Sequence, residues 1–287
     1  MTSDGAMKVL RAVADAARAD LAMPAGSYTS AAYYQLERKR LFQSTWVLAG
    51  CGQEIPEPGD VMPCEVAGYP VILVRKPNGD VGAFFNVCPH RGAELIARPC
   101  SGRRVLTCPY HAWTYDLDGR LRMRPYYNGG KEHDVADHAS GKAYPALTTI
   151  RAAMWADLVF VNIDGKAPPL DEHLKPAIEY FDGYDFSVMR LAQTLSFDVE
   201  ANWKLPIENF YDNYHIFSLH PLVDAGLSQE HRTPSEWLGG PFIKGGYRVD
   251  GPASDWISGI ERNPNVCERL RNYNSFVAIA PNVMMQV

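Results

Sequence analysis

The chain has 287 residues, a mass of 32.0 kDa and 46% hydrophobic residues, a size and composition that allow a buried core and exclude a disordered protein. Its formal net charge of -5 gives no general attraction for phosphate backbones or anionic membranes, so neither nucleic acid nor a membrane is an expected partner. Six cysteines are too few for a disulfide scaffold, and no apolar run reaches bilayer-spanning length, which together predict a soluble cytoplasmic protein.

The first 44 residues are predicted to form a helical segment that packs on a later domain. Ala, Val and Leu recur at helical spacing over residues 7–22, and Pro24 ends that pattern. A second short helix is expected over residues 31–42.

Residues 45–165 change to short apolar runs separated by turn residues. A β-hairpin is predicted over residues 70–75 and 81–87, joined by the turn at 77–80, and further strands are expected over 105–107, 113–117 and 155–164. This stretch is therefore predicted to be a compact antiparallel β domain.

Pro168 and Pro169 mark the junction to a second domain over residues 166–287. Leu174, Ile178 and Phe181 are predicted to share one buried helix face. Apolar residues alternate with polar ones over 195–201, which predicts a half-buried strand, and a helix is expected to follow, starting near Pro206 and ending before Pro221.

The strongest motif combines Cys88 and His90 with Cys108 and His111, and 17 residues separate His90 from Cys108. Zinc fingers usually place two Cys in one loop and two His in the other, whereas a Rieske [2Fe-2S] centre has two thiolates on one iron and two imidazoles on the other. Here each loop carries one Cys and one His. This arrangement favours the Rieske centre, because both loops can then reach across a cluster whose two irons need different ligands. A zinc site is the alternative.

A second constellation contains Asn209, Asp212 and His215, spaced three residues apart, followed by His220. Residues five apart on an unbroken helix are offset by about 140°, so the helix must end near Ser218 if both imidazoles are to face one metal. Two His and one carboxylate form the facial triad of non-haem Fe(II) oxygenases. A surface pair of Asp212 and His215 is the alternative.

Other candidate ligands are interpreted as structural. His133 and His138 also have the five-residue spacing, but they lie between glycine pairs without a helical apolar face, so we expect a solvated loop. His173 and His231 are expected to be surface residues. The remaining cysteines are expected to be buried free thiols: Cys51, Cys64, Cys100 and Cys267.

The two motif loops resemble those of the large (alpha) subunit of Rieske non-haem iron ring-hydroxylating oxygenases. Residues 88–92 match the family pattern C-x-H-R-G, and residues 108–113 match C-P-x-H-G-W except that Ala112 replaces the usual Gly. A positive φ at Ala112 would add local strain. The segments 28–30 and 55–60 are closest to the branch with choline, betaine and carnitine monooxygenases and many ring hydroxylases.

The resemblance implies an α+β fold, with an antiparallel β Rieske domain followed by a helix-grip-like catalytic domain that is incomplete at its C-terminus. It assigns a [2Fe-2S] cluster to Cys88, His90, Cys108 and His111. It assigns a mononuclear non-haem Fe(II) to His215 and His220, and makes Asp212 a carboxylate bridging His215 and the partner subunit's His111. Asn209 corresponds to a polar residue beside the iron, and the implied assembly is a homotrimer.

The resemblance also implies partners: O2, a small organic substrate, and an NAD(P)H-dependent ferredoxin reductase or ferredoxin. The chain has no G-x-G-x-x-G or Walker A motif, so the nicotinamide and flavin are expected on another protein. Seven arginines between residues 91 and 124 could dock an acidic electron donor, although solvated loops explain them equally well: Arg91, Arg98, Arg103, Arg104, Arg120, Arg122 and Arg124.

Only 67 residues follow His220, whereas the family's third iron ligand is an Asp from much later in the catalytic domain. The resemblance therefore predicts a fragment or truncated product, and none of the later carboxylates has the family's ligand context: Asp224, Asp250, Asp255, Glu261 and Glu268. The predicted function is hydroxylation of an aromatic or quaternary ammonium compound. A Rieske electron-transfer protein and an inactive truncated oxygenase are the alternatives.

Overall fold

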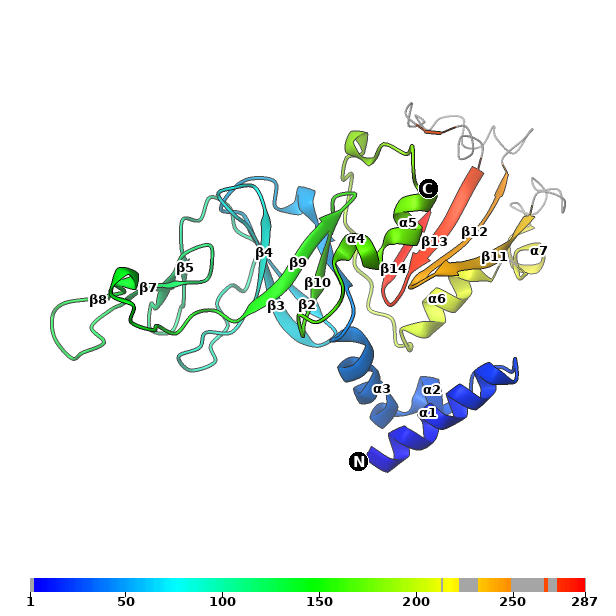
Figure 1. The fold of residues 1–287 in the computed structure, drawn as a ribbon, viewed down its shortest axis with the longest axis horizontal. Helices are drawn as coiled ribbons and strands as arrows, with labels where there is room; N and C mark the ends of the chain where they lie inside the picture. The colour runs from blue at the N-terminus through cyan, green and yellow to red at the C-terminus, as the bar shows by residue number, and fades with distance from the viewer. Residues whose placement is uncertain (1–2, 213, 222–231, 249–265, 268–272, 287) are drawn as a thin grey trace. The chain divides into compact units, whose positions relative to one another are not determined.

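The computed structural model describes residues 3–212, 214–221, 232–248, 266–267 and 273–286. The chain divides into two compact units. Residues 42–170 form the continuous unit, and residues 1–41 together with 171–287 form the discontinuous unit. Both combine helices or turns with antiparallel sheets, as expected for an α+β protein (Figure 1). Among the described residues, no helix is long and apolar enough to cross a bilayer.

The continuous unit is built on a six-stranded antiparallel sheet in the order β1-β10-β9-β4-β3-β2. The predicted hairpin is confirmed as β3 and β4, which pair through the turn at Asn78 and Gly79. Gly79 has a φ of 87°, which suits glycine in such a turn. The strands are β1 (Val47–Cys51), β2 (Val61–Val66), β3 (Tyr69–Arg75), β4 (Val81–Phe85), β9 (Thr149–Trp155) and β10 (Leu158–Asn162).

A second, smaller sheet of the continuous unit has the order β5-β6-β7-β8 (Figure 1). Its strands are β5 (Leu106–Thr107), β6 (Thr114–Tyr115), β7 (Leu121–Arg124) and β8 (Asp134–Val135). Side chains from both sheets share one hydrophobic core, which includes Ile72, Phe84, Leu106 and Tyr115. The motif cysteines Cys88 and Cys108 belong to this core, so the cysteine-bearing loops are anchored by its packing.

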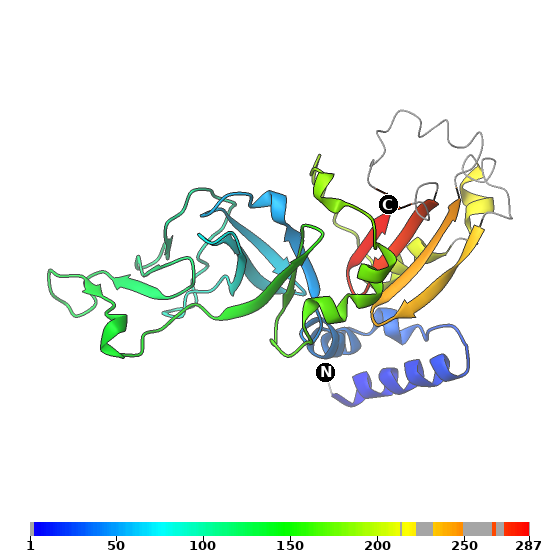
Figure 2. The ribbon, with the colours of Figure 1, turned by 45° about the horizontal axis from the view of Figure 1, so that its top comes forward.

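The N-terminal part of the discontinuous unit is helical, as predicted. It contains α1 (Ser3–Arg18), α2 (Gly26–Thr29), α3 (Ala31–Glu37) and a π-helical turn at Arg38–Phe42. Helix α1 lies along α2 and α3 (Figure 2). The Ser30 hydroxyl accepts a hydrogen bond from the Tyr33 N–H at 3.2 Å and so caps α3.

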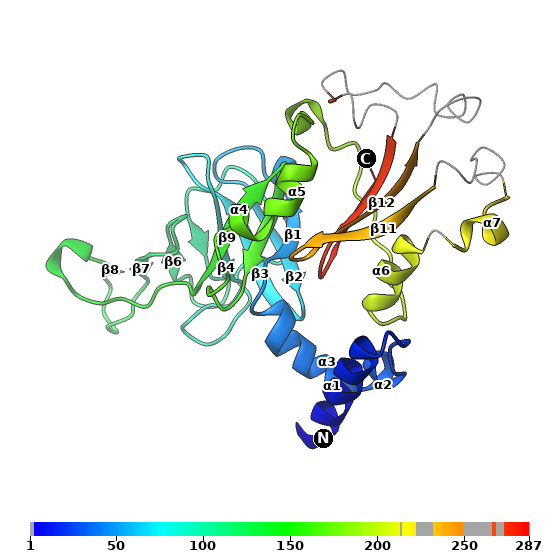
Figure 3. The same ribbon diagram turned by 45° about the vertical axis from the view of Figure 1, so that its right-hand side comes forward.

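The rest of the discontinuous unit contains a four-stranded antiparallel sheet in the order β11-β12-β13-β14, with α6 against β13 (Figure 3). The strands are β11 (Arg232–Gly239), β12 (Phe242–Arg248), β13 (Tyr273–Ile279) and β14 (Val283–Gln286). The helices are α4 (Leu170–His173), α5 (Lys175–Tyr180), η4 (Phe186–Val188), α6 (Lys204–Tyr211) and α7 (Ile216–Leu219). On the predicted α5 face, Leu174 and Phe181 are buried but Ile178 is exposed.

The half-buried strand predicted for residues 195–201 is wrong. This segment forms no strand, and Leu195, Phe197 and Val199 are 65%, 78% and 65% exposed. Alternating apolar residues give a chain one apolar side, but a strand also needs a hydrogen-bonded neighbour. No described strand supplies that neighbour.

The predicted helix between Pro206 and Pro221 is interrupted. Helix α6 ends at Tyr211, because Asp212 takes an extended conformation with φ -75° and ψ 95°. A separate helix, α7, then ends at Leu219, so the expected end near Ser218 is confirmed. The break places Asp212 in the turn that leads to His215.

Candidate metal centres

The two cysteine-histidine loops of the continuous unit have the same backbone geometry. In the first loop, the Cys88 N–H donates to the Ala93 carbonyl at 2.8 Å, and the Gly92 N–H donates to the Cys88 carbonyl at 2.9 Å. In the second, the Cys108 N–H donates to the Trp113 carbonyl at 2.9 Å, and the Ala112 N–H donates to the Cys108 carbonyl at 3.0 Å. Each loop therefore presents its thiol and imidazole from an equivalent turn.

Gly92 and Ala112 occupy equivalent positions in these turns, and both have positive φ angles, 72° and 54°. Glycine adopts this conformation without penalty, whereas the Cβ of alanine clashes with its own backbone at a cost of about 1–2 kcal/mol. The strain expected at Ala112 from the family pattern is confirmed.

Ala112→Gly is expected to raise the free energy of unfolding of the continuous unit by about 1 kcal/mol, because it removes this strain. Gly92→Ala is the matched reverse change: a Cβ there meets no atom within 4 Å, so only backbone strain is added and a similar loss is expected. Thermal denaturation of the full chain, followed by circular dichroism, measures both. Equal stabilities for Ala112→Gly and the parent would contradict the assignment.

The two thiols lie together at the buried end of the loops. Cys88 and Cys108 are 1% and 2% exposed, and their side chains are within hydrogen-bonding reach of each other. Burial raises the pKa of the Cys88 thiol, while hydrogen bonds from the Tyr115 hydroxyl and the His90 backbone N–H oppose that shift. The Tyr115 hydroxyl lies 3.4 Å from the Cys88 sulfur and can donate to a thiolate there.

The two imidazoles form the other half of the group, with ring centroids 4.7 Å apart. Burial, His111 and Arg91 lower the pKa of His90, which favours the neutral imidazole that can donate a lone pair. The Nδ1 atom of His111 is buried and has no hydrogen-bond partner in the described part of the chain. Paired thiols beside paired imidazoles, one with an unsatisfied buried nitrogen, fit the donor set of a Rieske [2Fe-2S] cluster.

Aromatic rings flank both imidazoles. The Trp113 indole stacks on His90 with centroids 4.4 Å apart and planes 4° from parallel. The Tyr110 ring lies 3.8 Å from His111, and its side chain is largely exposed. Trp113 itself is buried, so its imidazole partner His90 is covered more completely than His111 is by Tyr110.

Asn86 holds the first loop in place, a role that the sequence motifs do not indicate. Its side chain is buried at the end of β4, and its Oδ1 accepts hydrogen bonds from the Leu95 and Ile96 N–H groups at 3.1 and 3.0 Å. Its Nδ2 donates to the Ile96 carbonyl at 2.7 Å. Asn86 thus ties the far side of the first loop to the strand that enters it. A lone Asn two residues before a Cys gives no sequence signal for this role.

The second constellation lies in the turn between α6 and α7. His215 Nδ1 is 3.2 Å from Asp212 Oδ2, and Asp212 Oδ1 accepts a hydrogen bond from the Tyr214 N–H at 2.7 Å. The His215 and His220 ring centroids are 5.3 Å apart. If Nδ1 carries the proton given to Asp212, the Nε2 lone pair of His215 is left for a metal.

The structure does not bring together all the predicted residues of the second constellation. Asn209 lies exposed in the last turn of α6, before the chain turns at Asp212. Across the residues that the structure describes, no group of three or more His, Cys, Asp or Glu side chains is placed to hold one metal ion. The later carboxylates considered from sequence lie outside the described residues: Asp224, Asp250, Asp255, Glu261 and Glu268.

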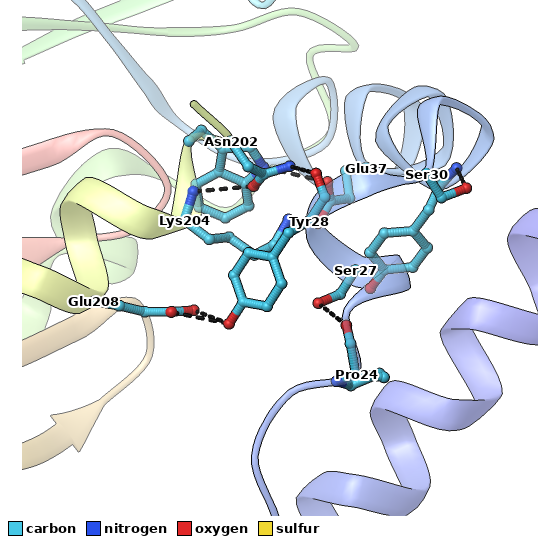
Figure 4. A network of polar contacts seen from close by, with 10 residues as sticks. Pro24, Ser27, Tyr28, Ser30, Glu37, Asn202, Lys204 and Glu208 are labelled. Atoms are coloured by element: carbon cyan, nitrogen blue, oxygen red, sulfur yellow. Dashed lines mark hydrogen bonds and ion pairs between the residues drawn. The ribbon is translucent and has the colours of Figure 1, made fainter. Parts of the chain in front are cut away.

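The start of α6 is fixed by a polar network with the N-terminal helices (Figure 4). Lys204 Nζ lies 2.8 Å from Glu37 Oε1 in a buried ion pair, and the Trp203 indole N–H donates to Glu37 Oε2 at 3.2 Å. The Tyr28 hydroxyl donates to the Glu208 carboxylate at 2.8 Å, and burial together with Glu208 raises the pKa of Tyr28 to about 12. This network anchors the helix that leads to Asp212.

Two histidines that the sequence analysis interpreted as structural, His138 and His173, are described by the structure. The Nε2–H of His138 donates to the Leu121 carbonyl at 2.7 Å, so that nitrogen is not free for a metal. The segment that contains His138 was expected to be a solvated loop, but it includes strand β8, which pairs with β7. His173 is half-buried rather than on the surface, and burial lowers its pKa. His231 lies outside the described residues.

The cysteines outside the motif differ in part from the expected buried free thiols. The four cysteines outside the motif are free, as expected, but half-buried rather than buried: Cys51, Cys64, Cys100 and Cys267. Burial and a hydrogen bond to Asp157 raise the pKa of the Cys51 thiol to about 11.

Of the seven arginines, six are exposed, whereas Arg124 is 8% exposed and cannot contribute to a docking patch.

Comparison with known proteins identifies a domain family for each of two parts of the chain. Residues 45–137 match the family model of the Rieske [2Fe-2S] domain, and residues 186–287 match that of the ring hydroxylating alpha subunit catalytic domain. The carnitine monooxygenase oxygenase subunit of Acinetobacter pittii is 30% identical over 73% of this chain and 56% of its own length. The glycine betaine monooxygenase oxygenase subunit of Chromohalobacter salexigens is 32% identical over 70% of this chain and 44% of its own.

Among solved structures, the quaternary ammonium Rieske monooxygenase CntA in complex with an inhibitor has the same fold. Its TM-score is 0.74 at 23% identity, covering 92% of this chain and 67% of that one. The chain spans about half the length of the curated relatives it matches. It belongs to the alpha-subunit family of Rieske non-haem iron oxygenases, with a Rieske [2Fe-2S] domain followed by a catalytic domain of the kind that uses mononuclear iron.

Proposed function

We propose that this protein is the oxygenase component of a Rieske non-haem iron oxygenase, which hydroxylates a small organic substrate with O2 and electrons from a reductase. One observation carries the proposal. Two buried thiols and two adjacent imidazoles, with an unsatisfied Nδ1 on His111, precede a turn that pairs His215 with His220 and Asp212. An electron-transfer protein would need only the first of these groups.

In this proposal Cys88, Cys108, His90 and His111 hold the cluster, and His215 and His220 hold the mononuclear iron. When bound, the cluster passes single electrons and the iron activates O2. The chain's own part is to orient the imidazoles: Asp212 accepts a hydrogen bond from the Nδ1–H of His215 and so directs Nε2 toward the metal. Asp212 is also proposed to bridge to the partner subunit's His111 in a homotrimer, and Asn209 to lie beside the iron.

For the substrate, we propose a quaternary ammonium or aromatic compound. Tyr214 and Phe217 form an edge-to-face pair with centroids 5.4 Å apart next to His215, and both rings are exposed. Exposed aromatic faces can attract a quaternary ammonium group or stack on an aromatic ring. The electron donor is proposed to be a ferredoxin or an NAD(P)H-dependent ferredoxin reductase with an acidic surface. It would dock on the exposed arginines around the cluster loops, such as Arg91.

The proposal is tested first by electron paramagnetic resonance of the reduced protein. A Rieske signal is expected in the parent chain and in Cys64→Ser, and its loss is expected in Cys88→Ser and His111→Ala. Oxygen uptake with a suitable reductase, against aromatic acids and quaternary amines, then tests the activity. A colourless protein that binds one zinc ion through the four motif residues would refute the assignment.

A further inference from the structure

Arg124, at the end of β7, is buried in a position where an arginine needs specific partners. It is 8% exposed, and its Nε donates to Asp134 Oδ2 at 2.6 Å while its Nη2 pairs with the same carboxylate. Asp134 is its direct cross-strand neighbour on β8. The charge of Arg124 is therefore compensated inside the continuous unit and is not available to an electron donor.

The faces of this guanidinium are covered by aromatic rings. Its central carbon lies 3.7 Å from the Tyr127 ring centroid, 5.4 Å from that of Trp113 and 5.9 Å from that of Tyr144. Tyr127 also packs edge-on against Trp113, with centroids 5.7 Å apart. A desolvated cation is attracted to aromatic faces, so these contacts restrain the indole of Trp113.

Trp113 in turn lies flat on His90, with centroids 4.4 Å apart and planes 4° from parallel. Arg124, Trp113 and His90 thus form one contiguous stack, from an ion pair in the β7-β8 hairpin to an imidazole of the metal-binding loops. An aromatic ring that contacts both an arginine and an imidazole has little freedom to tilt.

We propose that Arg124 is a positioning residue for the [2Fe-2S] centre, because it fixes the indole of Trp113 and, through it, the ring plane of His90. The inference rests on the proposed role of His90 as a cluster ligand. The orientation of an imidazole ligand affects the electronic structure of the iron it binds, and charges and contacts around the ligands set the reduction potential. Arg124 is therefore expected to affect both properties.

The test compares Arg124→Gln with Arg122→Gln in the full chain. Both changes remove one positive charge from β7, but Arg122 is exposed and outside the stack. We expect Arg124→Gln to shift the g-values of the reduced cluster and lower its reduction potential, and Arg122→Gln to leave the g-values unchanged. Arg124→Lys keeps the charge but loses the planar group, so an altered signal is expected there too. It is the variant to measure if Arg124→Gln does not fold.

If the folded Arg124 variants have the g-values and reduction potential of Arg122→Gln, the proposal is overturned. The assignment of the cluster ligands is tested separately by the parent chain and His90→Ala. A parent Rieske signal that survives His90→Ala refutes the ligand assignment, whereas a signal lost in His90→Ala but unchanged in both Arg124 variants refutes only the positioning role.

Discussion

Lys204→Met is expected to lower the free energy of unfolding of the discontinuous unit by about 3–5 kcal/mol. Lys204 and Glu37 expose 10% and 9% of their side chains, and their charged atoms are 2.8 Å apart. Methionine fills the space of the lysine stem but leaves the Glu37 carboxylate as a buried charge without its cation. The urea midpoint of the full chain, followed by tryptophan fluorescence, measures the loss.

An exposed ion pair of the same unit provides the control. Lys175 and Glu179 are 3.7 Å apart and exposed, so Lys175→Met should cost less than about 1 kcal/mol. The double change Lys204→Met with Glu37→Leu should recover most of the lost stability, because it removes the unpaired charge. Equal losses for Lys204→Met and Lys175→Met would show that the buried pair does not anchor α6.

Asp212→Asn is expected to slow oxidation of the reduced cluster in a single turnover by about 10–100-fold, with the content of both metals retained. An asparagine side chain has nearly the same shape and can still accept a hydrogen bond from the Tyr214 N–H, which lies 2.7 Å from Oδ1. It lacks the negative charge that holds the Nδ1 proton of His215 and that is proposed to reach the partner subunit's His111. Stopped-flow absorbance of the reduced protein, mixed with O2 and substrate, measures the rate.

Asp185→Asn is the matched control for this experiment. Asp185 also accepts a backbone N–H two residues ahead, from Ser187 at 2.9 Å, and it accepts the Ser187 hydroxyl at 2.6 Å. Its substitution should leave the rate unchanged. A normal rate in Asp212→Asn would exclude a bridging role for Asp212, and loss of mononuclear iron would instead assign Asp212 to metal binding.

The sequence predicted the cluster loops well because their signal is local. Each loop places its Cys, its His and its turn residue within five positions, and the turn hydrogen bonds fix φ at Gly92 and Ala112. The family pattern therefore even predicted the strained position of Ala112. The hairpin of β3 and β4 was predictable for the same reason, since its turn residues adjoin the strands they join.

Features that depend on distant parts of the chain were not predictable. The alternation around Phe197 indicates a strand, but alternation cannot show whether a partner strand lies beside it. Arg124 counts as one more positive charge in the sequence, and only the fold shows that Asp134 and three aromatic rings enclose it. The break at Asp212 was missed because an i+3 spacing looks the same in a continuous helix and in a helix that ends.

The contacts between the N-terminal helices and α6 also join parts of the chain that are synthesised far apart in time. Tyr28 and Glu208 are 180 residues apart in sequence, and Glu37 and Lys204 are 167 apart. Residues 1–41 leave the ribosome first but must wait for residues 171–287, while the intervening residues 42–170 form one uninterrupted stretch that can fold in between. If residues 42–170 fold first, Glu37 and Lys204 are joined by a folded unit and not by a long flexible loop. This lowers the entropic cost of bringing them together. The cysteine-histidine loops belong to this stretch, so they leave the ribosome before the turn that contains Asp212 and His215.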